Sequence, residues 1–136
     1  HDLVAYERSA YRAWRASVQA LSPAAARSDG WTIADVLAHV SAWHRYSTDR
    51  ISTILRDGVD PGPPEDTDAF NERARAEAPP WEELRAEASR AHRRLLDLVA
   101  TLPDERVADD DGLIAFIVRA NGSEHYAEHP ASAFDA

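Results

Sequence analysis

The sequence predicts an all-α domain, folded as a four-helix bundle with a long connection between its second and third helices. Three observations predict this fold. Apolar residues recur at alternating three- and four-residue intervals in four separate segments. No segment shows a convincing two-residue alternation typical of a half-buried strand. The length of 136 residues fits one domain, which we place at residues 1–136. Amphipathic helices of this kind bury their apolar stripes against one another in a bundle.

The first helix is expected over residues 2–21, and one member of its inward stripe is charged. The expected inward residues are Val4, Glu7, Tyr11, Trp14, Val18 and Leu21. A buried carboxylate is costly unless it is hydrogen-bonded or lies near a cation. We therefore predict that Glu7 is a catalytic general base or a hydrogen-bond acceptor beside a metal. The alternative is a helix phase one position away, which would place Glu7 on the surface.

The second helix is expected to begin after Thr32, because residues 32–35 read as a capping box. Residues 57–58, Asp-Gly, provide a glycine C-cap at its other end. Its expected buried face consists of Ile33, Val36, Val40, Trp43, Ser47, Ile51 and Ile54. His39 lies on one flank of this stripe with Tyr46, and His44 lies on the other. Tyr46 either completes the edge of the core or serves as a catalytic residue in a pocket.

The connection over residues 57–80 contains five prolines, which prevent long regular structure. We expect a short helix over residues 67–78, with Phe70 packing inward. Connections of this length are usually functional or disordered.

The third and fourth helices complete the predicted bundle. The third is expected over residues 80–102, between two prolines. Asp111, at the end of an acidic run, is predicted to cap the fourth helix. The first inward residues of that helix are expected to be Leu113, Phe116, Ile117 and Ala120. Asn121-Gly122 predicts an irregularity, after which Ser123 restarts the helix and Pro130 ends or kinks it.

His125 and His129 are spaced four residues apart, so both rings stand on one helix face with Cβ atoms about 6 Å apart. Both nitrogens can then reach one ion at about 2.0–2.1 Å. If His39 arrives from the second helix, the three residues form a metal site with open coordination positions. The alternative is a pair of solvated histidines near the end of the chain. His44 competes with His39 for the third place, and His92 reads as a flank residue.

Composition excludes several classes of function. The chain has no cysteine and no lysine, so it has neither a thiolate ligand nor a side chain for a Schiff base. A histidine and carboxylate ligand set suits Zn, Ni, Fe or Mn. The net charge of −9 argues against nucleic-acid binding, which needs clustered cations. No apolar run approaches the roughly 20 residues of a membrane span. We expect a cytoplasmic protein without a membrane partner.

Two motifs resemble the DinB superfamily. The segment 31–40, WTIADVLAHV, followed by Trp43, is similar to the second helix of that family. The segment 123–129, SEHYAEH, is similar to its last conserved motif. The resemblance implies a DinB-type four-helix bundle with a divalent-metal triad. Residue by residue, the triad corresponds to His39, His125 and His129.

The resemblance also implies a range of activities. Members include putative hydrolases, and S-transferases and isomerases that use bacillithiol or mycothiol. We therefore expect a metal-dependent hydrolase or a thiol (mycothiol-type) transferase that acts on a small electrophilic substrate, in detoxification. Its cofactor would be a divalent metal ion, Zn, Ni or Fe, together with a low-molecular-weight thiol cosubstrate in the transferase case.

Two alternatives stay open. Residues 70–72, Phe-Asn-Glu, and the His-Tyr-x-Glu-His ending also resemble the ClbS/DfsB branch, some members of which hydrolyse genotoxins without metal. In that self-resistance hydrolase, Glu7 and Tyr46 would position the water. The third interpretation is a non-enzymatic module that binds a small molecule or forms a homodimer, with which the acidic charge is compatible.

Overall fold

The computed structural model describes residues 2–135, so His1 and Ala136, the ends of the expected domain, lie outside the described residues. Within that range the chain is helical, and the only β feature is an isolated bridge between Ala26 and Thr32. The helices are α1 (Asp2–Gln19), α2 (Ile33–Asp57), α3 (Thr67–Ala76), α4 (Trp81–Ala100), α5 (Asp104–Ala120), α6 (Ser123–Glu128) and the 3-10 turn η1 (Ala131–Ala133). The predicted helical bundle is confirmed.

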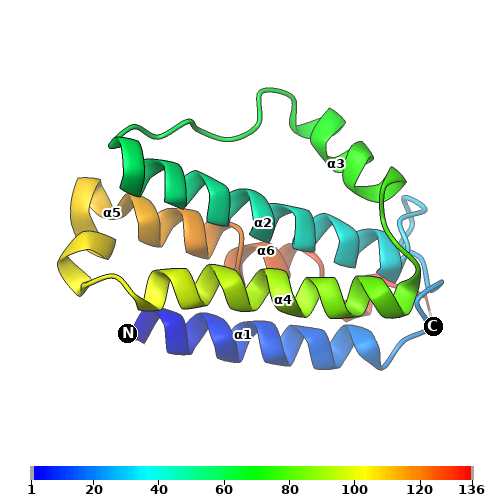
Figure 1. The fold of residues 1–136 in the computed structure, drawn as a ribbon. Coiled ribbons are helices and arrows are strands. Elements are labelled where there is room, and N and C mark those ends of the chain that lie inside the picture. Colours follow the sequence, from blue (N-terminus) through cyan, green and yellow to red (C-terminus); the bar gives the residue numbers. More distant parts are fainter. Residues whose placement is uncertain (1, 136) are drawn as a thin grey trace.

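The four long helices run along a common direction, and the connection after α2 crosses back over the bundle (Figure 1). As a result α2 and α4 run parallel to each other, while α1 and α5 run the opposite way. After α5 the chain continues through the short helix α6 toward the C-terminus (Figure 1), and α6 packs against α1 and α5. No helix within residues 2–135 has both the length and the apolar character to cross a membrane.

The ends of α2 are formed as the sequence predicts. The Thr32 side chain accepts a hydrogen bond from the backbone N–H of Asp35, and the Asp35 carboxylate accepts one from the backbone N–H of Thr32 at 3.0 Å. Gly58 closes the helix with φ of 72°, a left-handed conformation that glycine adopts without steric cost. These local caps fix the phase of α2 and hence the direction in which His39 projects.

The short helix α3 packs on α2 through aromatic side chains. The Phe70 ring lies 4.9 Å from the ring of Trp43 and 5.6 Å from that of Tyr46, measured between centroids. The Tyr46 hydroxyl donates a hydrogen bond of 2.6 Å to the carbonyl of Gly62. These contacts fasten the long connection to the second helix.

Two predictions for the fourth helix are wrong. Asp111 has φ of 56° inside a left-handed turn over residues 110–112, whereas a capping residue is usually extended. This turn changes the helix phase, so that the side chains of Ile114, Ile117 and Val118 are buried. Phe116, predicted to face inward, is 56% exposed.

A layer of buried polar residues divides the apolar core into two clusters. One cluster includes Trp14 from α1, Leu37 from α2 and Tyr126 from α6. The other includes Ile51 from α2 and Leu95 from α4. The polar layer between them contains Glu7 from α1, His44 and Ser47 from α2, and His92 from α4. Polar groups in such a layer need partners, because an unpaired polar atom in the core is costly.

Candidate metal centre

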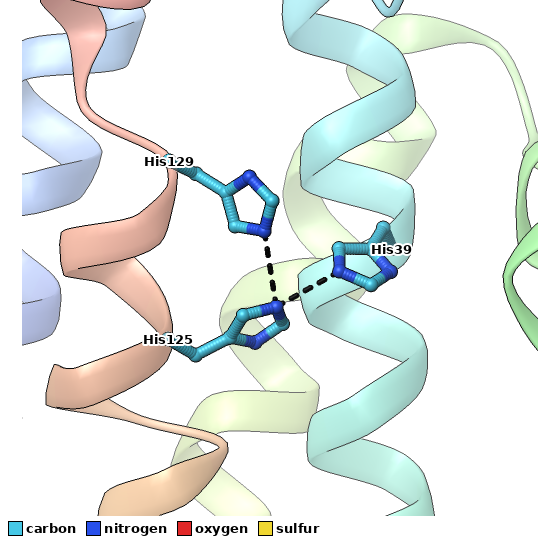
Figure 2. Close-up of side chains that lie close together, drawn as sticks. All are labelled: His39, His125 and His129. Atoms are coloured by element: carbon cyan, nitrogen blue, oxygen red, sulfur yellow. Dashed lines mark hydrogen bonds between the residues drawn. The ribbon is translucent and has the colours of Figure 1, made fainter. Parts of the chain in front are cut away.

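Three imidazole rings from two helices meet at one point (Figure 2). His39 projects from α2, His125 from α6, and His129 is the C-cap residue of α6. The Nε2 atom of His125 lies 2.8 Å from Nε2 of His39 and 3.1 Å from Nε2 of His129. Ligand nitrogens about 2.1 Å from one ion stand about 3.0–3.4 Å apart at angles of 90–109°. These two contacts are close to that separation, and the ligand atoms of all three residues lie within 4.8 Å of one another, so the cluster could hold a metal ion once the rings draw together.

The position of α6 follows from its ends. Pro130 stops the helix immediately after His129, as the sequence predicts. The indole Nε1 of Trp14 donates a hydrogen bond of 2.9 Å to the carbonyl of His129. The Tyr126 ring stacks on that of Trp14 with centroids 5.2 Å apart. These contacts with α1 fix the six-residue helix, which would be marginal alone.

The orientation of His39 is set by Asn71 from α3. The Asn71 Oδ1 atom accepts hydrogen bonds from the indole Nε1 of Trp43 and from Nδ1 of His39, both at 2.9 Å. Since Oδ1 only accepts, Nδ1 of His39 must carry the proton in this contact. The Nε2 lone pair of His39 is therefore free to face the other two histidines, as a metal ligand requires.

Arg27 has the opposite effect on His129, because it places the ring proton on Nε2 and not on Nδ1. Its guanidinium donates a hydrogen bond of 2.8 Å to Nδ1 of His129 and also pairs with Asp29. The neutral His129 ring then carries its proton on Nε2, the nitrogen that faces His125. Neutral rings cannot satisfy both contacts of His125 Nε2. If this nitrogen carries a proton, the proton faces that of His129; if it carries a lone pair, the lone pair faces that of His39. A cation at the meeting point removes this mismatch if Arg27 releases His129.

Burial keeps all three rings uncharged near neutral pH. Removal from water lowers the pKa of His39 to about 4, that of His125 to about 3 and that of His129 to about 4. Neighbouring histidines lower the first two further, and Arg27 lowers the pKa of His129. Neutral imidazole is the form that binds metal, so the site is ready for an ion without first losing protons.

Glu7 is buried with 1% exposure, and its partner is the start of α6. Its carboxylate oxygens accept from the backbone N–H of Ser123 at 2.9 and 3.3 Å. The pKa of Glu7 is raised, because the effect of burial exceeds that of the hydrogen bond from Ser123 and of the charge of Arg119, which both lower it. The carboxylate thus satisfies a free N–H group in the first turn of the helix that carries His125. A Cβ atom on Gly122 would collide with the same carboxylate, so glycine is required there.

The remaining candidates lie apart from the three rings. The hydroxyl of Tyr46, predicted as catalytic, is bonded to the Gly62 carbonyl, and its ring packs against Phe70. His44 is fully buried and its Nε2 lies 2.8 Å from the hydroxyl of Tyr126. His92 stacks on Tyr11 with ring centroids 3.7 Å apart. Neither His44 nor His92 joins the cluster, in agreement with the preference for His39.

Comparison with known proteins agrees with the fold. Residues 5–111 match the DinB superfamily. The chain belongs to the DinB superfamily. No curated protein and no solved structure matches this chain. The match to the DinB superfamily includes His39 but ends before α6, so it does not depend on His125 and His129.

Sequence reasoning missed two residues that act on the cluster. Asn71 stands in a segment noted for another resemblance, and an amide on a short helix gave no indication of its partner 32 positions earlier. Arg27 lies between α1 and α2, where the sequence shows no periodic pattern. Both contacts depend on tertiary packing.

Proposed function

We propose that this DinB superfamily protein is a metal-dependent enzyme, a hydrolase or a thiol S-transferase, that acts on a small electrophilic molecule in detoxification. The observation that supports this proposal is the convergence of three buried, neutral imidazoles on one point. Zn, Ni and Fe are the candidate ions, because the ligands are nitrogen atoms alone.

Three histidines leave coordination positions open, which distinguishes catalytic sites from closed structural ones. A divalent ion held there would supply a Lewis acid that makes water or a thiol a stronger nucleophile near neutral pH. Asn71 orients His39, and Glu7 positions the start of α6. Trp31 stands edge-on to His39 with ring centroids 5.5 Å apart.

Two arginines lie near the cluster, and each is ion-paired, Arg27 with Asp29 and Arg75 with Asp35 and Glu72. The guanidinium carbons of Arg27 and Arg75 lie 5.4 and 4.5 Å from the Trp31 ring centroid. Arg27 also touches His129, so a thiolate that displaced this contact would meet a positive charge beside the cluster. This arrangement supports the transferase form of the proposal, with a low-molecular-weight thiol as cosubstrate.

A thermal-shift titration tests the metal site. Protein stripped by a chelator should melt at a higher temperature with Zn, Ni or Fe(II), because binding at a thousandfold excess over Kd stabilises by about 4 kcal/mol. His125→Ala should remove the shift, while His92→Phe, a control outside the cluster, should keep it. No shift with any of these ions would exclude the proposed metal site.

The metal-independent alternative has less support. It would need Glu7 and Tyr46 in one pocket, yet their polar atoms are engaged by Ser123 and Gly62 respectively. Turnover of an electrophile that survives complete removal of metal would restore that alternative. The homodimer, the cytoplasmic location and the single-domain organisation stay predictions, and size-exclusion chromatography with light scattering tests the first.

A further inference from the structure

An open groove of about 400 Å³ lies between α1 and α4, which pack side by side (Figure 1). The groove shares none of its lining with the three histidines of the candidate metal centre. Its lining residues are Arg8, Tyr11, Arg12, Arg15, Ala16, Gln19, Ser89, His92 and Arg93.

The charge of this groove is opposite to that of the whole chain. Four of its nine lining residues are arginines and none is a carboxylate, although the chain has 24 acidic and 15 basic residues. Arg8 pairs with Asp97 at 2.8 Å, and both side chains are exposed. Within residues 2–135, Arg12, Arg15 and Arg93 form no ion pair. The groove is therefore a local concentration of uncompensated positive charge.

Arg15 is the central observation, because it is only 8% exposed and has neutral partners alone. Its guanidinium donates to the Tyr11 hydroxyl at 2.7 Å and to the Ser89 hydroxyl at 3.2 Å. With its amide turned to suit both groups, Gln19 accepts from the remaining nitrogens of Arg15 at 2.7 and 3.2 Å. A buried charge without a counter-ion is unfavourable, so a protein that retains one has a reason to do so.

A second buried side chain in the groove has a nitrogen without a hydrogen-bond partner. His92 is 9% exposed, and its Nε2 atom has no hydrogen bond within the described residues. The ring is held rigidly by stacking on Tyr11, whose hydroxyl in turn donates to the Ala88 carbonyl at 3.3 Å. The floor of the groove is therefore fixed and polar.

The arginines form a row along α1. Arg8, Arg12 and Arg15 are spaced at i, i+4 and i+7, which extends about 10 Å along the helix axis. Arg93 faces this row from α4. One small anion cannot reach the whole row, whereas two linked anionic groups can contact both ends of it.

We infer that the groove between α1 and α4 binds a small molecule with two anionic groups, phosphate or carboxylate. Guanidinium groups recognise both kinds of anion through paired N–H donors. Arg15 provides the fixed contact at one end of the row, and Arg12 and Arg93 close on the ligand from the two helices. This site is separate from the proposed metal centre and does not depend on it.

Calorimetric titration with two probes tests the inference. Fructose 1,6-bisphosphate should bind the wild-type protein at least tenfold more tightly than inorganic phosphate. For carboxylates, succinate should likewise bind more tightly than acetate. The double variant Arg12→Gln/Arg93→Gln removes two exposed charges without disturbing the core, and should weaken bisphosphate binding at least tenfold. Arg94→Gln, the neighbouring exposed arginine outside the groove, should change the affinity less than twofold.

Three results would overturn the inference. The first is no binding of the bisphosphate or of succinate by the wild-type protein up to about 10 mM. The second is an equal loss of affinity in Arg94→Gln, which would mean diffuse attraction and not a site. The third is a double variant that loses self-association in light scattering but keeps its affinity for the bisphosphate, which would assign the groove to a protein partner.

Discussion

Glu7 connects the first helix to the helix that carries two of the three converging histidines, and its replacement separates two roles. In Glu7→Ala the backbone N–H of Ser123 loses the acceptor that lies 2.9 Å away. An unsatisfied N–H costs about 1–3 kcal/mol. The cavity left by a side chain with 1% exposure adds to this cost. We expect the free energy of unfolding to fall by about 2–4 kcal/mol, and zinc affinity to fall at least tenfold as α6 loosens.

Glu7→Gln is the matched control, because the amide oxygen can still accept from Ser123. Burial raises the pKa of Glu7, so its ionised form is less favourable in the fold than in the unfolded chain. The corresponding contribution to stability is present below the unfolded pKa and is lost as pH rises through the folded value. Loss of the charge at pH 7 is therefore tolerated, and we expect a change within about 1 kcal/mol.

Urea unfolding and calorimetric zinc titration measure both quantities for both variants. The reasoning is refuted if Glu7→Ala keeps the wild-type stability and zinc affinity, or if Glu7→Gln is as damaged as Glu7→Ala. A third outcome concerns chemistry. Glu7→Gln that binds zinc normally but no longer turns over substrate would assign Glu7 as the predicted general base.

Three further predictions follow from other contacts. Gly122→Ala should lower the free energy of unfolding by about 1–3 kcal/mol in urea, because its Cβ would strike the Glu7 carboxylate. Burial lowers the pKa of His92 to about 4 in the folded protein. Below pH 6.5 the unfolded chain takes up a proton that the folded protein does not, so the free energy of unfolding falls as the pH drops from 6.5 toward 4. Between pH 7 and 5 His92 accounts for about 2 kcal/mol of that loss, and His92→Phe should lose correspondingly less. Arg27→Met should tighten zinc binding about fivefold, since Nδ1 of His129 can then carry its proton; weaker binding would contradict the assigned proton positions.

Local sequence rules predicted the helices and the histidine cluster. The capping box at Thr32 and the glycine at position 58 fix α2, and the stripe on that helix places His39. The i, i+4 spacing places the other two rings together wherever α6 lies. Local rules could not predict whether α6 faces the side of α2 that carries His39. The family resemblance predicted that it does, and the structure places the three rings together.

The errors came where local preference conflicts with the observed backbone. Asp110 and Asp111 adopt positive φ values, which non-glycine residues rarely adopt, so a capping role was the simpler prediction for the acidic run. The left-handed turn then shifted the helix phase and exposed Phe116. The partners of Glu7 and His39 are distant in sequence, and only the packed structure identifies Ser123 and Asn71.

The metal content of untagged protein, measured by elemental analysis after purification without chelator, tests the central claim most directly. The convergence of His39, His125 and His129 predicts about one Zn, Ni or Fe ion per chain, and almost none in His39→Ala or His125→Ala. Wild-type protein that is free of metal, and stays so after incubation with each ion and desalting, would contradict it.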